Sequence, residues 1–79
     1  MYIVYSLQSE INPLKFYIGV TEDLDRRLSE HKSGQCSFTS EYRPWRLAFF
    51  IGLSDKKKAW LLEKYLKGGS GRAFSKKHF

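Results

Sequence analysis

The order of strand-like and helix-like segments is the feature that most constrains the fold of this chain. Residues 2–7 and 16–21 are rich in β-branched and aromatic side chains, and turn-forming residues separate the two runs. A third run, residues 46–53, is almost continuously apolar and follows a proline, which favours a strand over a helix. We therefore predict a β-hairpin with a rather long loop and a third strand later in the chain.

Two other segments have the pattern of amphipathic helices. Residues 23–32 begin with capping side chains and first-turn acids and are followed by a Ser-Gly stop signal. Residues 55–67 follow Ser54, the expected helix cap, and precede two glycines. The residues of this second helix predicted to face the core are Ala59, Leu62 and Leu66.

The remaining segments complete the predicted fold. Residues 33–44 are polar and turn-rich and are expected to form a loop with one irregular turn, whereas residues 70–78 are expected to form a last short basic helix. The order ββαβαα predicts an α/β (α+β) fold, in which helices flank a three-stranded, mainly antiparallel sheet. With 79 residues and 42% apolar side chains, we expect one domain over residues 1–79 with one compact core.

Positive charge is concentrated in the last third of the chain. Residues 1–55 have a net charge of −1, whereas residues 56–79 carry eight basic side chains and one acid, for a net charge of +7. This asymmetry is typical of proteins that bind a polyanion, most often nucleic acid. A solvated basic helix that keeps the protein soluble is the alternative.

Other classes of protein are disfavoured by the composition. No run approaches the roughly 18 apolar residues that a membrane span needs, and the first residues lack the features of a signal peptide. The chain has a single cysteine, Cys36, which excludes an internal disulfide framework and fits a reducing compartment. We expect a soluble cytoplasmic protein without a membrane partner.

Two ionisable residues lie beside the apolar stripe of the first predicted helix. Arg27 and His31 are four residues apart, so both project from one side of the helix along the edge of the core. This placement is suited to catalysis or phosphate binding. The alternative roles are structural: the arginine covers apolar surface with its aliphatic stem, and the histidine caps the helix end.

Glu63 is the only acid among the last 24 residues of the sequence. A carboxylate in basic surroundings suits a divalent metal, since Mg²⁺ is commonly held by one or two carboxylates while phosphate and water complete its coordination. An ordinary helical ion pair with Lys67 is the alternative.

The hairpin contributes two tyrosines to one predicted face of the sheet. Tyr5 and Tyr17 are expected to project on the same side as Gly19, where a missing side chain would leave a bare patch that admits a phosphate backbone. Tyrosines on strands are, however, mostly packing residues.

Taken together, these residues resemble the GIY-YIG nuclease superfamily. The resemblance rests on Ile3-Val4-Tyr5, on Tyr17-Ile18-Gly19, and on the pattern T-x-D-L-x-R-R-L-x-x-H that starts at Thr21. Tyr42-Arg43-Pro44-Trp45 and the residues from Glu63 to Lys67 are also similar to small, single-domain members related to the nuclease module of the bacterial excinuclease C subunit. Ile3 replaces the glycine of the first motif, and no asparagine follows Asn12, although many members have one after the glutamate.

The resemblance implies a metal-dependent DNA endonuclease that hydrolyses phosphodiester bonds in DNA repair or recombination. Its implied catalytic residues are Tyr5, Tyr17, Arg27, His31 and Glu63, with Mg²⁺ or Mn²⁺ held by Glu63. Either tyrosine could orient or deprotonate the attacking water, and His31 could accept the proton. The residues expected to contact DNA are Gly19, Arg26, Lys64, Lys67, Arg72, Lys76 and Lys77.

Two further hypotheses compete with a nuclease. A non-catalytic nucleic-acid-binding module would keep the fold and the basic surface, and would not bring the five implied catalytic residues to one open cleft. A protein-interaction domain built on Trp45, Trp60 and Phe79 would have a large exposed apolar patch. For a nuclease of this size, target choice must come from DNA structure, self-association or a partner protein.

Overall fold

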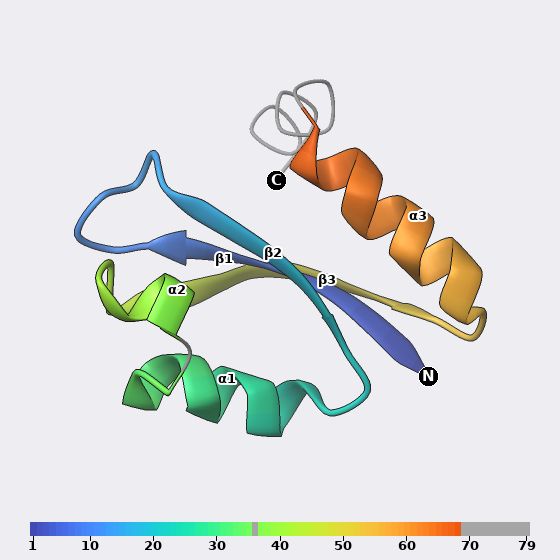
Figure 1. Cartoon of the computed structure of the whole chain (residues 1–79), viewed down its shortest axis with the longest axis horizontal. Helices are drawn as coiled ribbons and strands as arrows, with labels where there is room; N and C mark the ends of the chain where they lie inside the picture. The colour runs from blue at the N-terminus through green and yellow to red at the C-terminus, as the bar shows by residue number, and fades with distance from the viewer. Residues whose placement is uncertain (36, 69–79) are drawn as a thin grey trace.

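Three antiparallel strands form the centre of the molecule (Figure 1). The computed structural model describes residues 1–35 and 37–68. Strand β1 (Tyr2–Ser9) pairs with β2 (Phe16–Thr21) on one side and with β3 (Trp45–Leu53) on the other, so the sheet order is β2-β1-β3. The predicted hairpin, the third strand and the α+β fold class are confirmed.

Helix α1 (Leu24–Ser33) and helix α3 (Lys56–Lys67) have well-defined ends. The Asp23 side chain caps α1 by accepting a hydrogen bond from the backbone N–H of Arg26, and Gly34 ends this helix with a φ of 83°. Asp55, not the predicted Ser54, caps α3. The reason is that α3 starts at Lys56, so the Asp55 carboxylate accepts hydrogen bonds from the first free backbone N–H groups.

The predicted loop after α1 contains a short helix, α2 (Ser37–Ser40). This segment was expected to contain no more than an irregular turn. The predicted helix over residues 70–78 lies outside the described residues. Within residues 1–35 and 37–68, no helix is long and apolar enough to cross a membrane.

Neighbouring residues of β1 point to opposite faces of the sheet, and each face has its own helix. On one face Val4 packs with Ile18 of β2 and with Ala59 and Leu66 of α3, and these four side chains form the apolar core. The predicted core stripe of α3 is thereby confirmed, since Leu62 is also partly buried against this cluster.

The opposite face carries buried polar side chains. Tyr5 of β1 contacts His31 of α1, and His31 in turn contacts Thr39 of α2. All three side chains are almost completely enclosed. Burial of polar groups is tolerated because each of these side chains has a hydrogen-bond partner.

Candidate active site

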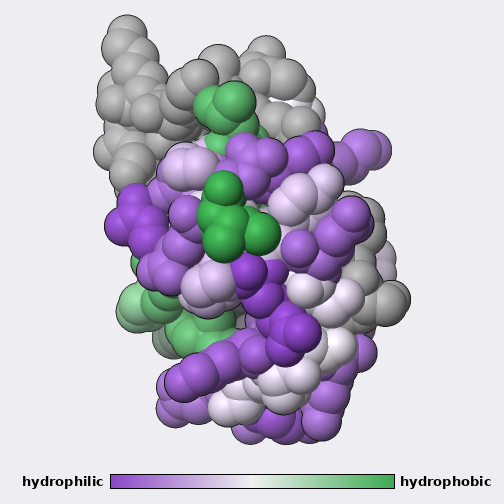
Figure 2. All heavy atoms as spheres, turned by 90° about the vertical axis from the view of Figure 1, so that its left-hand side faces the viewer, coloured by the Kyte–Doolittle hydropathy of each residue, from purple (hydrophilic) through white to green (hydrophobic). Residues whose placement is uncertain are grey.

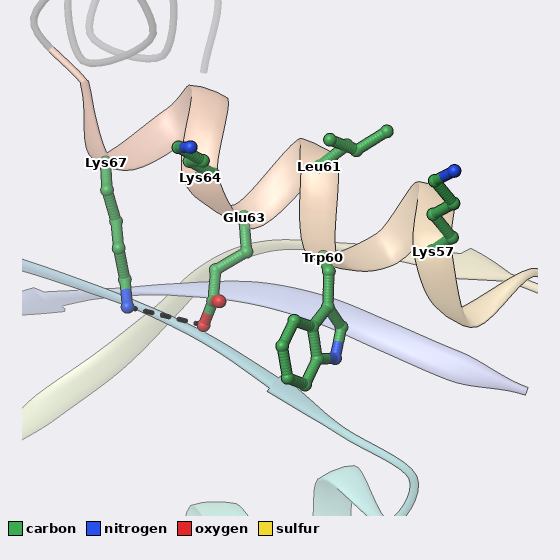
Figure 3. A pocket seen from close by; sticks show the side chains of 6 residues that line it. All are labelled: Lys57, Trp60, Leu61, Glu63, Lys64 and Lys67. Carbon is green, nitrogen blue, oxygen red and sulfur yellow. Dashed lines mark ion pairs between the residues drawn. The ribbon is translucent and has the colours of Figure 1, made fainter.

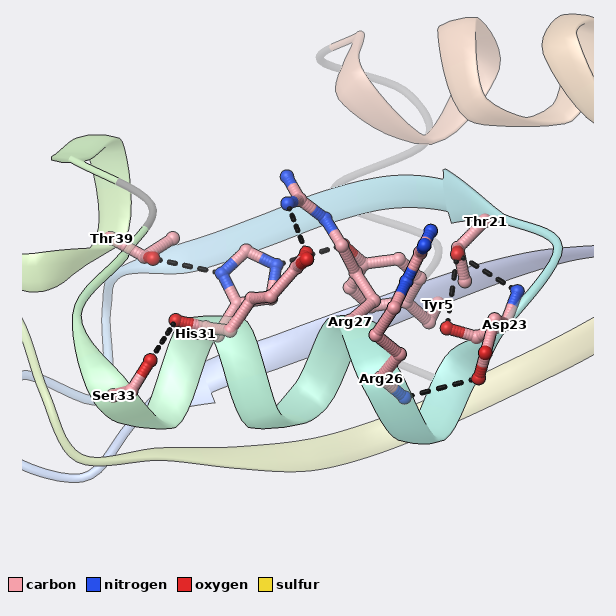
Figure 4. Close-up of polar contacts among 9 residues, drawn as sticks. Tyr5, Thr21, Asp23, Arg26, Arg27, His31, Ser33 and Thr39 are labelled. Atoms are coloured by element: carbon pink, nitrogen blue, oxygen red, sulfur yellow. Dashed lines mark hydrogen bonds and ion pairs between the residues drawn. The ribbon is translucent and has the colours of Figure 1, made fainter.

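Tyr5 lies at the centre of a hydrogen-bonded cluster on the α1 face of the sheet (Figure 4). Its Oη is 2.8 Å from His31 Nε2 and accepts a hydrogen bond from Arg27 Nε at 3.3 Å. Because Arg27 and His31 are one helical turn apart on α1, both reach the same phenol. The predicted proximity of these three residues is therefore present in the structure.

His31 is held at both ring nitrogens. Its Nδ1 is 2.8 Å from Thr39 Oγ1, while its Nε2 faces Tyr5. The backbone carbonyl of Thr39 accepts a hydrogen bond from Trp45 Nε1 at 2.7 Å, which ties α2 to the start of β3. These contacts fix the orientation of the imidazole.

Tyr17 completes the cluster from the edge strand β2. Its ring centroid is 4.8 Å from that of His31 and 6.2 Å from that of Tyr5. Unlike Tyr5, which is fully buried, Tyr17 is partly exposed.

Burial and neighbouring charges shift the proton affinities of this cluster. Burial raises the pKa of Tyr5 to about 12, an effect that the hydrogen bond from Arg27 partly offsets. Burial, together with the positive charge of Arg27, lowers the pKa of His31. The hydrogen bond to the Glu30 carboxylate, at 2.9 Å, raises the pKa of Arg27. At neutral pH the cluster thus holds a neutral phenol, a neutral imidazole and a guanidinium cation.

The prediction of a bare patch at Gly19 is wrong. Gly19 pairs with Tyr5 across the two strands and is itself buried. A Cβ atom added at Gly19 would lie 2.6 Å from Tyr5 Oη, so the tyrosine ring lies over the position that a side chain would fill. The glycine makes room for Tyr5 and is not available to a phosphate backbone.

A hollow of about 500 Å³ brings Glu63 and Arg27 together. Arg27 reaches it from α1 and Glu63 from α3, at the end of β2, the edge strand. Figure 4 shows the Arg27 side chain extending from α1 toward the side on which α3 lies. Glu30, Arg26, Lys56 and Trp60 also line the hollow. Two helices from opposite faces of the sheet therefore contribute opposite charges to one site.

The expectation that all five implied catalytic residues line one open cleft is wrong for Tyr5 and His31, and Tyr17 is not among the residues that line the hollow shared by Arg27 and Glu63. Tyr5 is 0% exposed and His31 is 1% exposed. Tyr5 contacts Arg27 directly, and His31 contacts Tyr5. Sequence analysis placed His31 at the border of the apolar stripe, but it is the buried residue of α1. The sheet accommodates it because Tyr5 and Thr39 satisfy both of its nitrogens.

The suitability of this site for a metal depends on Glu63. Its side chain is 26% exposed, and its Oε2 lies 3.4 Å from Lys67 Nζ, so the alternative helical ion pair is present. Among the described residues, no three His, Cys, Asp or Glu side chains are grouped to hold an ion. The residues thus fit Mg²⁺ or Mn²⁺ bound by one carboxylate with water and phosphate oxygens, not a metal held by protein alone.

The other residues predicted to contact DNA occupy separate positions. Arg26 lines the hollow with Arg27, whereas Lys64 and Lys67 line a second hollow along α3 (Figure 3). The predicted contacts that lie outside the described residues are Arg72, Lys76 and Lys77.

The structure also tests the aromatic residues of the protein-interaction hypothesis. Trp45 is half-buried and hydrogen-bonded, Trp60 is 61% exposed, and Phe79 lies outside the described residues. The face on the left of Figure 1 is mainly hydrophilic, with its apolar side chains in small separate areas (Figure 2). The exposed Trp60, Leu61 and Tyr65 belong to α3, which lies on the right of Figure 1, away from the face seen in Figure 2.

Sequence analysis missed two residues of the site, Thr39 and Glu30. Thr39 lies in a polar segment without periodicity, where no pattern distinguishes it from its neighbours. Glu30 could have been found, because it lies three residues after Arg27 on the same helix, the spacing of an ion pair.

Nearly the whole sequence is similar to known proteins. The chain is similar to the Structure-specific endonuclease subunit SLX1 of Scheffersomyces stipitis, with 45% identity over 56 residues. The matched part covers 63% of this chain and 17% of that protein, so the chain spans a small part of this relative. The family model described as the GIY-YIG catalytic domain matches residues 1–77. Because this match extends over nearly the whole sequence, the chain belongs to the GIY-YIG family.

Proposed function

We propose that this chain is a divalent-metal-dependent endonuclease that hydrolyses phosphodiester bonds in DNA. The observation that carries the proposal is the shared hollow, in which Arg27 of α1 and Glu63 of α3 face the same space. A cation and a carboxylate in one hollow can hold a phosphate and its metal ion together. Membership of the GIY-YIG family supports the same reaction.

In this proposal Arg27 binds the scissile phosphate. A guanidinium can donate two parallel hydrogen bonds to phosphate oxygens, and these strengthen as negative charge develops in the transition state. Glu30 and Tyr5 orient the group through contacts of 2.9 Å and 3.3 Å. A side chain held in this way loses little conformational freedom when the substrate binds.

Glu63 would hold the metal ion, Mg²⁺ or Mn²⁺. When bound, such an ion supplies positive charge that stabilises the leaving oxygen. Lys67, the present partner of Glu63, is more than half exposed and can turn to a phosphate of the DNA instead.

Of the two tyrosines, Tyr17 is the better candidate for orienting or deprotonating the attacking water. The pKa of Tyr5 is raised to about 12 and its ring is enclosed, so it is a poor base and does not reach solvent. Tyr17 is partly exposed and lies beside the neutral imidazole of His31. Tyr5 then serves as a positioning residue for Arg27.

The biological setting is proposed from the relative and the composition. The relative is a structure-specific endonuclease subunit, which suggests that this chain also acts on branched or interrupted DNA in repair or recombination. Because the relative is a subunit, we propose that this chain works with a protein partner or with a second copy of itself. The single cysteine suits the reducing cytoplasm.

A cleavage assay on a panel of linear, nicked, flapped and branched DNAs tests the proposal. We expect products with Mg²⁺ or Mn²⁺ and none with a chelator. DNA binding should weaken with salt, with a log–log slope of about −0.9 for each phosphate neutralised. Salt-sensitive binding without cleavage under any metal would instead favour the non-catalytic binding module.

A further inference from the structure

Trp60 is an exposed aromatic side chain next to the proposed metal ligand. It is 61% exposed, although an indole is usually well buried in a small domain. In Figure 3 the ring projects from α3 on the same side as Glu63 and Lys67. The same ring lines the hollow that contains Arg27 and Glu63. The indole therefore borders the space in which the scissile phosphate is proposed to lie.

Several lysines lie near this ring, together with the carboxylates of Glu22, Glu30 and Glu63. Lys56 Nζ lies 5.8 Å from the ring centroid, at the distance of a cation–π contact. Lys57, Lys64 and Lys67 line the second hollow of about 490 Å³, which Trp60 shares. An aromatic face among lysines is the arrangement by which proteins bind single-stranded nucleic acid, with bases stacked on rings and phosphates beside cations.

Building on the proposed function, we infer that Trp60 is a stacking platform for an unpaired base of DNA next to the cleaved bond. A base within a duplex is covered by its neighbours on both faces, so it cannot stack on a protein ring. An unpaired base at a flap, a nick or a junction has a free face. Stacking on Trp60 would place the adjoining phosphate toward Arg27 and Glu63, and it would select DNA that has single-stranded character at the cut.

Binding measurements in a chelator test this inference without any cleavage. The probes are a plain duplex, the same duplex with a short oligo-dT flap, and the same duplex with an abasic flap that keeps the phosphates. We expect the oligo-dT flap to quench tryptophan fluorescence. This quenching should vanish in Trp60→Phe, which leaves only Trp45 to report.

Affinity gives the second readout. Trp60→Ala should weaken binding to the oligo-dT flap by roughly 5- to 150-fold, the worth of one stacked base, and leave the plain duplex and the abasic flap unchanged. Trp60→Phe should retain most of the affinity because its ring can still stack. Leu61→Ala is the matched control, since Leu61 is 58% exposed but has no aromatic face and projects from the other side of α3 in Figure 3.

Three outcomes would overturn the inference: equal loss on all three DNAs, no loss with Trp60→Ala, or a loss with Leu61→Ala as large as that with Trp60→Ala. These binding outcomes are independent of whether the chain cleaves DNA. A chain that shows flap-dependent quenching but never cuts DNA refutes the proposed function and leaves the stacking platform standing. Besides the three binding outcomes, wild-type cleavage of flapped DNA by Trp60→Ala would refute the stacking platform and leave the proposed function standing.

Discussion

The two faces of the central sheet are built in different ways. The face under α3 buries Val4, Ile18 and Leu66, which are stabilised by apolar contact without directional bonds. The face under α1 buries Tyr5 and His31, which depend on a chain of specific hydrogen bonds. A small domain gains more stability per residue from the first kind of packing, so the polar face is explained better by the positioning of Arg27 than by stability.

The same strand serves both faces because side chains alternate along β1. The helices of the two faces both reach one hollow at the edge of the sheet, to which α1 contributes Arg27 and α3 contributes Glu63. Changes on the two faces should therefore have different consequences. Truncating an apolar side chain under α3 should lower the stability of the fold through lost burial. Removing a polar group under α1 should lower catalysis and also leave a buried hydrogen-bond partner unsatisfied.

The largest expected effect is on the apolar face. Leu66 is 3% exposed, so Leu66→Ala should lower the free energy of unfolding by about 2–5 kcal/mol through lost burial and a cavity. Urea denaturation measures this value. Leu61→Ala, at an exposed position of the same helix, should stay within about 0.5 kcal/mol of the wild type. Similar losses in the two variants would contradict the assignment of the core to this face.

Arg27→Ala is the corresponding change on the polar face. It removes the group proposed to stabilise charge on the phosphate, so the single-turnover cleavage rate should fall about 10²–10³-fold, equivalent to about 2.7–4 kcal/mol. DNA affinity should change much less. Arg27→Lys should recover only part of the rate because an ammonium cannot make paired hydrogen bonds. Full activity of either variant would remove Arg27 from the mechanism.

A matched pair of tyrosine changes compares the faces directly. Tyr5→Phe leaves the buried His31 Nε2 without its present partner at 2.8 Å, and should cost about 1–3 kcal/mol of unfolding free energy. The same chemical change at Tyr2, which packs against the apolar core, should cost within about 0.5 kcal/mol. Denaturation curves for the two variants provide the test, and equal costs would mean that the two faces do not differ in this respect.

The smallest effect is a pH dependence of stability. The folded protein lowers the pKa of His31, whereas in the unfolded chain a histidine has a pKa of about 6.5. Below about pH 6.5 the unfolded chain therefore binds a proton that folded His31 does not. Stability should fall with decreasing pH, by at most about 1.4 kcal/mol per pH unit from this group. His31→Gln should flatten this part of the profile, and an unchanged profile would show that His31 is not the source.

The fold was predictable from the sequence because its signals are local. Runs rich in β-branched and aromatic residues, and one almost continuously apolar run, marked the strands. Asp23 and Gly34 marked the ends of α1 within one turn of the helix. The predicted cap of α3, Ser54, is one residue before the observed cap, Asp55. Sequence alone did not separate the two because both side chains can act as caps.

The site was less predictable because it depends on contacts between distant segments. Tyr5 and His31 are 26 residues apart, and the depth of His31 depends on Thr39, which carries no periodic signal. Likewise, Gly19 was expected to be bare because the sequence does not reveal that its cross-strand neighbour Tyr5 folds over it. The sequence therefore indicated which residue types could form the site, but it did not indicate which of those side chains would be buried.

Cleavage by Glu63→Gln, compared with Lys67→Met, tests the central claim most directly. Both variants remove the ion pair at 3.4 Å, but only Glu63→Gln removes the proposed metal ligand. At saturating protein, we predict that Glu63→Gln cuts DNA about 10²-fold or more slowly while binding it at least as tightly, because several kcal/mol of metal assistance is lost. Lys67→Met should still cut bound DNA. Wild-type cleavage by Glu63→Gln, or equal loss in both variants, would show that Glu63 serves only the ion pair.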